Sequence, residues 1–280
     1  MIRLDLGPEP PELAAARDAG IARVLAGAQP PTRTQLTGYR QPTQRALHRR
    51  QFKKCAWCER PVGRTGEPVE HVRPKAGATS ADGTASPQHY WWLTWTWENL
   101  VFSCASCNSQ GNKGNRFWLM AGTPRLPIPV PPVNPSWFDV SAESPVLIDP
   151  RREDPLDFIE WRVVDQRLPR RRWRWTIRGR DPQKRGSGSI ELLGLKSLVD
   201  TVNAHLQGLL ALDAQLRAHL DGPRAAEAQA VWVDMVDAYV TKPGAPFRAA
   251  SWWALEALWP AAARSGAGLE AVARPGVRWR

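Results

Sequence analysis

The spacing of apolar residues predicts helices in the last third of the chain. Between residues 189 and 220, leucine, isoleucine and valine recur mostly three or four positions apart, which is the period of an α-helix. Two further helices are predicted over Ala225–Val240 and Ala249–Trp259. Charge pairs beside the leucine stripe are sparse, so we interpret it as the core of a helical bundle and not as a zipper for a partner.

Strict alternation replaces the helical period between Arg172 and Arg178. Trp173, Trp175 and Ile177 would share one face of a strand, while arginines and Thr176 occupy the other. Together with the apolar run over residues 158–164, this pattern predicts a β-hairpin with one basic face. Two interpretations of that face remain open, a DNA-binding ribbon and an ordinary exposed strand face.

The first half of the chain has shorter elements. Helices are predicted over residues 12–25 and 42–52, the second beginning with a proline. Residues 76–89 are rich in glycine and small polar residues and predict a flexible loop, and the proline-rich residues 124–135 predict a linker or an extended wrap. Bases stack on tryptophan rings, but we assign most of the four tryptophans between Tyr90 and Trp97 to core packing.

These changes of pattern predict an α+β protein with four regions. The predicted regions are a helical and extended lead over 1–50, a compact centre over 51–122, a proline-rich linker with the basic hairpin over 123–186, and a helical C-terminal region over 187–280 that we expect to dock onto a partner. The chain has 38 lysines and arginines against 27 acidic residues, a formal charge of +11. Such an excess favours a nucleic-acid partner.

A membrane protein is not predicted, because no apolar run approaches the ~20 residues that a membrane span requires. The N-terminus lacks the apolar core and cleavage site of a secretory signal, so we expect a cytoplasmic protein. In that compartment, paired cysteines hold a metal more often than they form disulfides.

All four cysteines lie in two C-x-x-C motifs, Cys55–Cys58 and Cys104–Cys107. Each motif can place two thiolates on one zinc ion, and two motifs complete a closed tetrahedral site that leaves no position for a substrate. We therefore predict a structural Zn2+. The insert between the motifs is longer than the ~15–20 residues of a simple zinc ribbon, so it is expected to fold into a unit of its own.

The insert contains Glu70-His71 in a short apolar segment that predicts a strand. A phosphodiester hydrolase needs a base for its nucleophilic water and a cation for the phosphate. His71 suits the base, and Glu70 with a side-chain amide from a nearby helix can hold Mg2+. Taken alone, such a histidine is more often structural and such a glutamate is a surface carboxylate.

The order of these motifs resembles the HNH endonuclease family, whose fold is a β-hairpin and a helix around one metal ion. The resemblance implies that His71 is the general base and that Asn99 holds the loop of this base in place. Asn108 occupies the last position of the motif, where the family often has histidine. Glu70 and Asn108 would then bind the catalytic Mg2+ or Mn2+. The resemblance further implies products with a 5′-phosphate and a 3′-hydroxyl.

Three basic residues are candidates for contacts with nucleic-acid phosphates. Lys113 and Arg116 are expected at the start of the helix that follows the second cysteine pair, and Lys75 on the other side. For each of them, a solvated surface position is the alternative.

Within the HNH family, the chain is most similar to the nuclease subunits of Septu-type and retron-associated anti-phage systems. This resemblance implies an SMC/ABC-like ATPase as the partner. Its specific part covers residues 52–117, and shorter flanking matches extend it to residues 38–220. The motifs that carry it are Cys55–Glu59, Glu70–Lys75, Tyr90–Leu93, Trp97–Leu100, Ser103–Asn108 and Lys113–Phe117.

Two other functions are compatible with the sequence. A non-catalytic zinc adaptor that binds nucleic acid or docks onto an ATPase would explain the basic charge and the C-terminal helices, but it has no need of Glu70, His71, Asn99 and Asn108 together. A sequence-specific homing or repair nuclease is disfavoured because neither a helix-turn-helix nor a zinc-finger array is recognisable.

Overall fold

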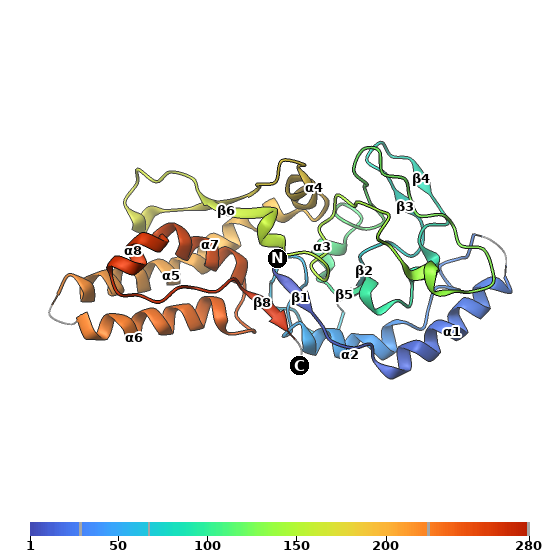
Figure 1. Cartoon of the computed structure of the whole chain (residues 1–280), viewed down its shortest axis with the longest axis horizontal. Helices are drawn as coiled ribbons and strands as arrows, with labels where there is room; N and C mark the ends of the chain where they lie inside the picture. Colours follow the sequence, from blue (N-terminus) through green and yellow to red (C-terminus); the bar gives the residue numbers. More distant parts are fainter. Residues whose placement is uncertain (28–29, 67, 223–224, 279–280) are drawn as a thin grey trace.

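The computed structural model describes residues 1–27, 30–66, 68–222 and 225–278, and Figure 1 shows an elongated molecule of mixed α/β structure. Helices α5 to α8 and strand β6 form one end of the molecule, and helices α1 to α3 with strands β2 to β5 form the other. The first and last strands lie between these two ends. Among the described residues, no helix is both long and apolar enough to cross a membrane.

The two termini of the chain meet in a parallel strand pair that the sequence did not predict. Strand β1 (Arg3–Asp5) pairs with β8 (Gly276–Arg278), and Leu4 lies opposite Val277. The side chains of Leu4 and Val277 are buried. Each strand has three residues, which is too short for a recognisable alternation of apolar and polar positions.

Both predicted N-terminal helices are present. Helix α1 covers Pro11–Leu25, and α2 covers Arg40–Arg50, so α2 begins two residues before the expected proline. Proline is tolerated in the first helical turn, where its missing N–H would have no helical partner. Thr43 and Leu47 are buried, and this face of α2 packs against β2 and β5.

The predicted central region contains the antiparallel pair β2 (Val69–His71) and β5 (Leu100–Phe102), in which His71 lies opposite Leu100. Helix α3 (Ala105–Asn108) follows β5 and is a single turn long. The expected loop over residues 76–89 contains a small hairpin of β3 (Ala78–Thr79) and β4 (Ala85–Ser86).

The tryptophans of this centre form its core, as predicted. Trp91, Trp92, Trp95 and Trp97 are each at most 3% exposed. They lie in and between two 3-10 turns, Trp91–Leu93 and Trp97–Asn99, which connect the small hairpin to β5. Packing against protein therefore accounts for these rings, and they are not available to stack on bases.

The predicted basic hairpin is confirmed with a later start for its second strand. Strand β6 (Ile159–Val163) pairs antiparallel with β7 (Trp175–Gly179). The second strand begins later than expected because residues 170–172 form a 3-10 turn. The alternation is confirmed, since Trp175 and Ile177 are buried and Arg178 is exposed. Arg178 binds Glu160, so part of the basic face is neutralised within the hairpin.

The helical bundle is also confirmed. It comprises α4 (Arg185–Leu192), α5 (Val199–Leu220), α6 (Ala225–Val236), α7 (Arg248–Leu258) and α8 (Ala261–Gly266). Leu206, Leu209 and Leu216 of α5 are buried, as a bundle core requires. The predicted helix over 225–240 ends as an α-helix at Val236 and continues as a π-helical turn over Asp237–Thr241. Pro223, a residue type that ends helices, lies outside the described residues.

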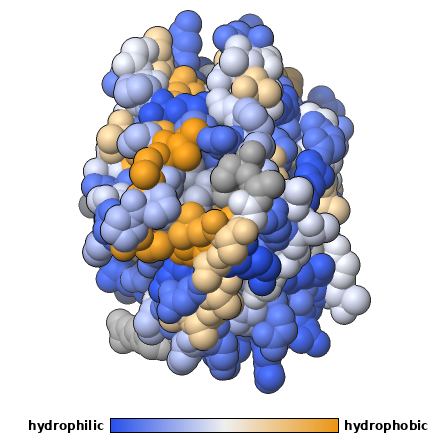
Figure 2. Space-filling view, turned by 90° about the vertical axis from the view of Figure 1, so that its right-hand side faces the viewer, coloured by the Kyte–Doolittle hydropathy of each residue, from blue (hydrophilic) through white to orange (hydrophobic). Residues whose placement is uncertain are grey.

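The proline-rich segment is an extended wrap beside the centre. Buried Glu143, which follows this segment, anchors its beginning by accepting a hydrogen bond from the backbone N–H of Leu126 at 3.0 Å. The same carboxylate accepts from Arg73 Nε at 2.8 Å and from the Tyr90 hydroxyl at 2.6 Å. Figure 2 shows apolar side chains gathered among polar ones on the face at the α1 end of the molecule. Exposed large apolar residues of this segment are Ile128, Val130 and Val133.

Helix α1 packs so closely on Trp95 that it has no room for a side chain at Gly20. A Cβ atom added there would lie 2.3 Å from the Trp95 ring. We expect Gly20→Ala to lower the free energy of unfolding by about 1–3 kcal/mol, although alanine favours helix formation. Gly266→Ala in α8, where no atom lies within 4 Å, is the control and should not destabilise. Urea unfolding of both variants measures this, and equal stabilities would contradict the packing.

Candidate metal and catalytic centre

The four cysteines converge on one point between the centre and the rest of the fold. Their Sγ atoms all lie within 4.8 Å of one another, and all four residues are buried. The Sγ atoms of Cys58 and Cys104 are 3.8 Å apart. Zn–S bonds of about 2.3 Å in a tetrahedron give sulfur separations of about 3.8 Å, so the cluster fits a zinc ion.

Backbone hydrogen bonds shape both cysteine turns. The N–H of Cys107 donates to Cys104 Sγ at 3.4 Å, and the N–H of Glu59 donates to the Cys55 carbonyl at 3.0 Å. The N–H of Ala56 reaches the Phe102 carbonyl at 2.9 Å, which attaches the first turn directly to strand β5. A closed four-thiolate site of this kind holds the two turns together and has a structural role.

Glu59 connects the first cysteine turn to both ends of the chain. Its buried carboxylate accepts from the Met1 amino group at 2.7 Å and from the backbone N–H groups of Arg248 and Ala249 at 3.0 and 3.2 Å. The terminal ammonium and nearby cations lower the pKa of Glu59 although burial opposes them. Glu59 lies in the Cys55–Glu59 motif, but the sequence indicated no role for it, because its partners are remote in sequence.

His71 lies at the end of β2 with both sides of its ring in contact with protein. Its Nε2 lies 3.0 Å from the Thr94 carbonyl, and the Tyr39 ring packs edge-on with 4.6 Å between the ring centroids. A carbonyl oxygen only accepts, so Nε2 carries the proton and Nδ1 keeps its lone pair.

Burial, with a smaller effect of the Lys75 charge, lowers the pKa of His71 to about 3. The imidazole is therefore neutral at physiological pH, which is the form that accepts a proton. The arrival of an anionic phosphate would raise this pKa, because an adjacent negative charge favours the imidazolium.

Asn99 fixes the loop that follows His71. Its Oδ1 accepts from the Arg73 N–H at 2.8 Å, and its Nδ2 donates to the carbonyls of Arg73 and Leu93 at 3.0 and 3.1 Å. The side chain is buried and directed into protein. Asn99 therefore positions the loop after His71 and does not face a substrate.

Glu70 and Lys113 form a buried ion pair at the centre of the site. Lys113 Nζ lies 2.5 Å from Glu70 Oε1, and the exposed fractions of these residues are 0% for Lys113 and 7% for Glu70. Burial raises the pKa of Glu70, and the lysine opposes that shift. Lys113 is thus placed as a counter-charge to Glu70, whereas the sequence suggested an exposed phosphate contact.

The predicted position of Lys113 and Arg116 at a helix start was wrong. Helix α3 ends at Asn108, and the following turn folds back so that the Lys113 N–H reaches the Cys107 carbonyl at 3.3 Å. Arg116 closes the same turn, with Nε bonded to the Asn112 carbonyl at 2.5 Å and Nη2 to the Gly111 carbonyl at 2.8 Å. A four-residue helix leaves too little pattern in the sequence to mark its end.

Lys75 is half-buried beside His71. Its Nζ donates to the Leu36 carbonyl at 2.7 Å and lies 4.8 Å from the centroid of the Tyr39 ring. Burial, followed by the charge of Arg33, lowers the pKa of Lys75 to about 8. The ammonium is therefore held close to the site, although it is already bonded to a backbone carbonyl.

A cavity of about 250 Å3 is lined by several of the residues that the sequence predicted for the site. Glu70, His71, Lys75 and Asn108 line it, whereas Asn99, Lys113 and Arg116 do not. Sequence reasoning missed Arg33 and Tyr39, which also line the cavity. Tyr39 lies within residues 38–220, over which the sequence resemblance was expected to extend, and this was the one available signal for it.

The donor atoms in the cavity fit a hard divalent cation. A Glu70 carboxylate and an Asn108 amide supply oxygens, and Mg2+ and Mn2+ prefer oxygen ligands while retaining several waters. Among the described residues, the four cysteines are the one group of three or more His, Cys, Asp or Glu that lies close enough to bind a metal on its own. An ion in the cavity would therefore need water or substrate oxygens as well.

The fold and site define a mixed α/β protein with a four-cysteine cluster beside a cavity that contains histidine and carboxylate. The chain is similar to the Septu protein PtuB of Bacillus mycoides (strain KBAB4), with 27% identity over 168 residues. The match covers 59% of this chain and 50% of PtuB, so the chain spans about half the length of this relative. No family model matches the chain, and neither does any solved structure.

We expect the purified protein to contain one Zn2+ per chain, because the cluster offers four thiolates. Replacing one ligand, in Cys104→Ala, should abolish stoichiometric zinc and lower the midpoint of thermal unfolding by 10 °C or more, on the order of the effect of losing a structural metal. Elemental analysis by mass spectrometry and calorimetry measure both quantities. Full zinc content in the variant would contradict the assignment.

The buried ion pair predicts a second effect. Lys113→Met keeps most of the side-chain volume but leaves the Glu70 carboxylate without its cation, at a cost of about 3–5 kcal/mol. Added Mg2+ should recover part of this loss if the ion binds Glu70. Thermal unfolding with and without Mg2+ measures this, with Lys242→Met at an exposed position as the control. Wild-type stability of the Lys113 variant would contradict the pairing.

Proposed function

We propose that this protein is a metal-dependent endonuclease that hydrolyses phosphodiester bonds of nucleic acid, with DNA as the expected substrate. The observation that carries this proposal is the cavity in which His71, Glu70 and Asn108 meet. A neutral base and two oxygen ligands in one cavity are the minimum that hydrolysis of a phosphodiester requires. The formal charge of +11 supports a polyanionic substrate.

In the proposed reaction, His71 activates the water. Its Nδ1 lone pair accepts a proton as the water oxygen attacks phosphorus, while Nε2 stays bonded to the Thr94 carbonyl. The P–O3′ bond then breaks, and the leaving oxygen takes a proton from solvent, which gives a 5′-phosphate and a 3′-hydroxyl. Asn99 keeps the imidazole in position through the loop that it holds.

Glu70 and Asn108, which line the same cavity as His71, would hold Mg2+ or Mn2+. When bound, the ion supplies positive charge for the phosphate and the leaving oxygen. Lys113 compensates the Glu70 carboxylate in the absence of an ion, because an unpaired carboxylate in this buried position would be unstable. Lys75, which also lines the cavity, would contribute a further positive charge.

The similarity to PtuB supports a role in Septu-type anti-phage defence. We propose that the chain is the nuclease effector of such a system and acts with an SMC/ABC-like ATPase. The helical bundle at the other end of the molecule is the proposed docking region, since it is separate from the cavity (Figure 1). Co-purification with an ATPase expressed from a neighbouring gene tests this part independently of activity.

One observation favours a second candidate function, a non-catalytic zinc adaptor. The Glu70 carboxylate that would bind the catalytic ion is already paired with Lys113. If that pair never opens, the cavity has a structural role, and nucleic acid would bind without an effect of Mg2+. Cleavage stimulated by Mg2+ distinguishes the two functions.

We expect His71→Ala to reduce cleavage of plasmid DNA in Mg2+ by roughly 100- to 10,000-fold, the usual contribution of a general base. Zinc content should equal that of the parent protein, because His71 is not part of the cysteine cluster. His219→Ala, in helix α5, is the control and should cleave like the parent. Undiminished nicking by the His71 variant would refute its assignment as the base.

A further inference from the structure

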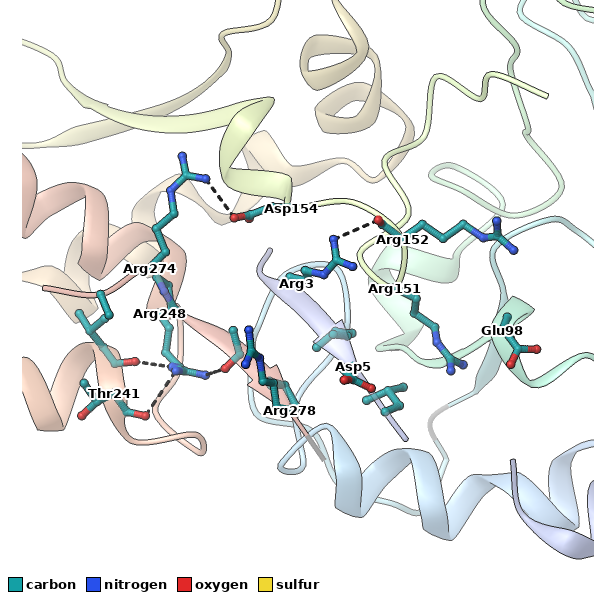
Figure 3. A pocket seen from close by; sticks show the side chains of 17 residues that line it. Arg3, Asp5, Glu98, Arg151, Arg152, Asp154, Thr241, Arg248, Arg274 and Arg278 are labelled. Atoms are coloured by element: carbon teal, nitrogen blue, oxygen red, sulfur yellow. Dashed lines mark hydrogen bonds and ion pairs between the residues drawn. The ribbon is translucent and has the colours of Figure 1, made fainter. Parts of the chain in front are cut away.

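One large cavity is rich in arginine but poorly suited to bind an anion. It has a volume of about 980 Å3 and lies around the β1–β8 pair (Figure 3). Five of its arginines have hydrogen bonds or ion pairs within the protein, as the dashed lines in Figure 3 show for Arg248 and Arg274. Arg248 donates to the carbonyls of Val240, Thr241 and Gly276, and Arg274 binds Asp154.

A second large hollow, of about 940 Å3, lies along helix α2 and has a different character. Four of its lining residues are basic, and no carboxylate of the described residues lines it. We call it the α2 groove. Its lining residues are Arg45, His48, Arg49, Phe52, Lys53, Pro61, Arg64 and Gly244.

The basic residues of the groove come from two segments that are held together. Arg45 and Arg49 lie one turn apart on the face of α2 opposite the buried Thr43 and Leu47. The segment that contains Arg64 is attached to this helix by two hydrogen bonds. Gln44 Nε2 donates to the Arg64 carbonyl at 3.1 Å, and His48 Nε2 lies 3.1 Å from the Val62 carbonyl.

The end of α2 places Lys53 beside this face in an unusual conformation. Phe52 and Lys53 have φ angles of 54° and 59°, a left-handed region that residues other than glycine rarely adopt. The Lys53 N–H bonds the His48 carbonyl at 2.8 Å, which ends the helix and turns the chain back. Lys53 is exposed, whereas the next residue, Lys54, is buried with Nζ bonded to the Ala245 carbonyl at 2.8 Å.

The groove and the catalytic cavity share no lining residue, but helix α2 connects them. Tyr39, which contacts His71, directly precedes α2. With a rise of 1.5 Å per residue, Arg45 and Arg49 lie about 9 and about 15 Å farther along the helix axis. A nucleic-acid strand advances about 3.4 Å per nucleotide in a duplex, so this interval corresponds to roughly three to four nucleotides.

We propose that the α2 groove binds the phosphate backbone of the nucleic acid whose scissile bond lies at His71. The proposal rests on the proposed nuclease function and adds the substrate-binding surface. Successive phosphates contact the four cations of the groove, which are Arg45, Arg49, Lys53 and Arg64. Because contacts to phosphates carry no information about the bases, the groove does not distinguish between base sequences. Binding is therefore independent of sequence and weakens steeply with salt.

The test is direct binding of the full chain to a fluorescein-labelled 20-base-pair DNA duplex and to one of its single strands, without added Mg2+, over a range of KCl concentrations. Arg45→Ala combined with Arg64→Ala removes two groove cations. Lys184→Ala combined with Lys196→Ala removes two exposed charges outside the groove and outside the basic hairpin, and is the charge-matched control. Zinc content and thermal unfolding verify that both variants fold.

For the groove variant, we expect duplex affinity to fall by about tenfold per lost contact at 0.1 M salt, and the slope of log K against log salt to decrease by about 0.9 per contact. The single strand should show a similar loss. The control should stay within about threefold of the parent. Equal losses in groove variant and control would overturn the proposal, because net charge alone would then explain binding.

Cleavage assays separate this proposal from the nuclease function. If the parent cleaves DNA while the groove variant binds and cleaves as well as the control, the proposed role of the groove is wrong and the nuclease assignment stands. If the parent binds DNA through the groove but never cleaves it, the groove stands and the nuclease assignment fails.

Discussion

The meeting of two cysteine turns that are far apart in sequence is the constraint on which the rest of the centre depends. Their four sulfurs lie within 4.8 Å of one another, and the chain between them can only fold as an insert with both ends fixed at that point. A zinc ion on four thiolates contributes folding free energy of about 10 kcal/mol or more. That contribution allows a unit with two three-residue strands and a one-turn helix to hold buried charges at its centre.

Those buried charges determine what the site can do. Glu70 is stable in its position because Lys113 compensates it, and His71 is neutral because burial opposes its protonation. Neither state requires a ligand, so the site is prepared before substrate or ion arrives, which is the arrangement that lowers the cost of reorganisation during a reaction. The same pairing sets a condition for the proposed activity, because a divalent ion would have to share or replace Lys113 as the partner of Glu70.

Sequence patterns predicted the elements whose period extends over several turns or residues. The leucine stripe of α5 and the alternation around Trp175 and Ile177 were confirmed by burial. The β1–β8 pair and the end of α3 were not predictable, because three or four residues carry no period and the partner strand is at the other end of the chain. Motif order indicated which residues meet in the cavity, but the burial of Lys113 depends on a turn folding back, and no local pattern specifies that.

The most direct test of the account is the location of a second metal ion. Crystals of the zinc-containing protein soaked in Mn2+ should show anomalous scattering at the cavity, with Mn2+ bound to the Glu70 carboxylate and the Asn108 amide oxygen and Lys113 Nζ displaced from Oε1. Glu70→Gln should lose this ion and keep zinc. A saturating soak that leaves the Glu70–Lys113 pair intact and no ion in the cavity would contradict the central claim.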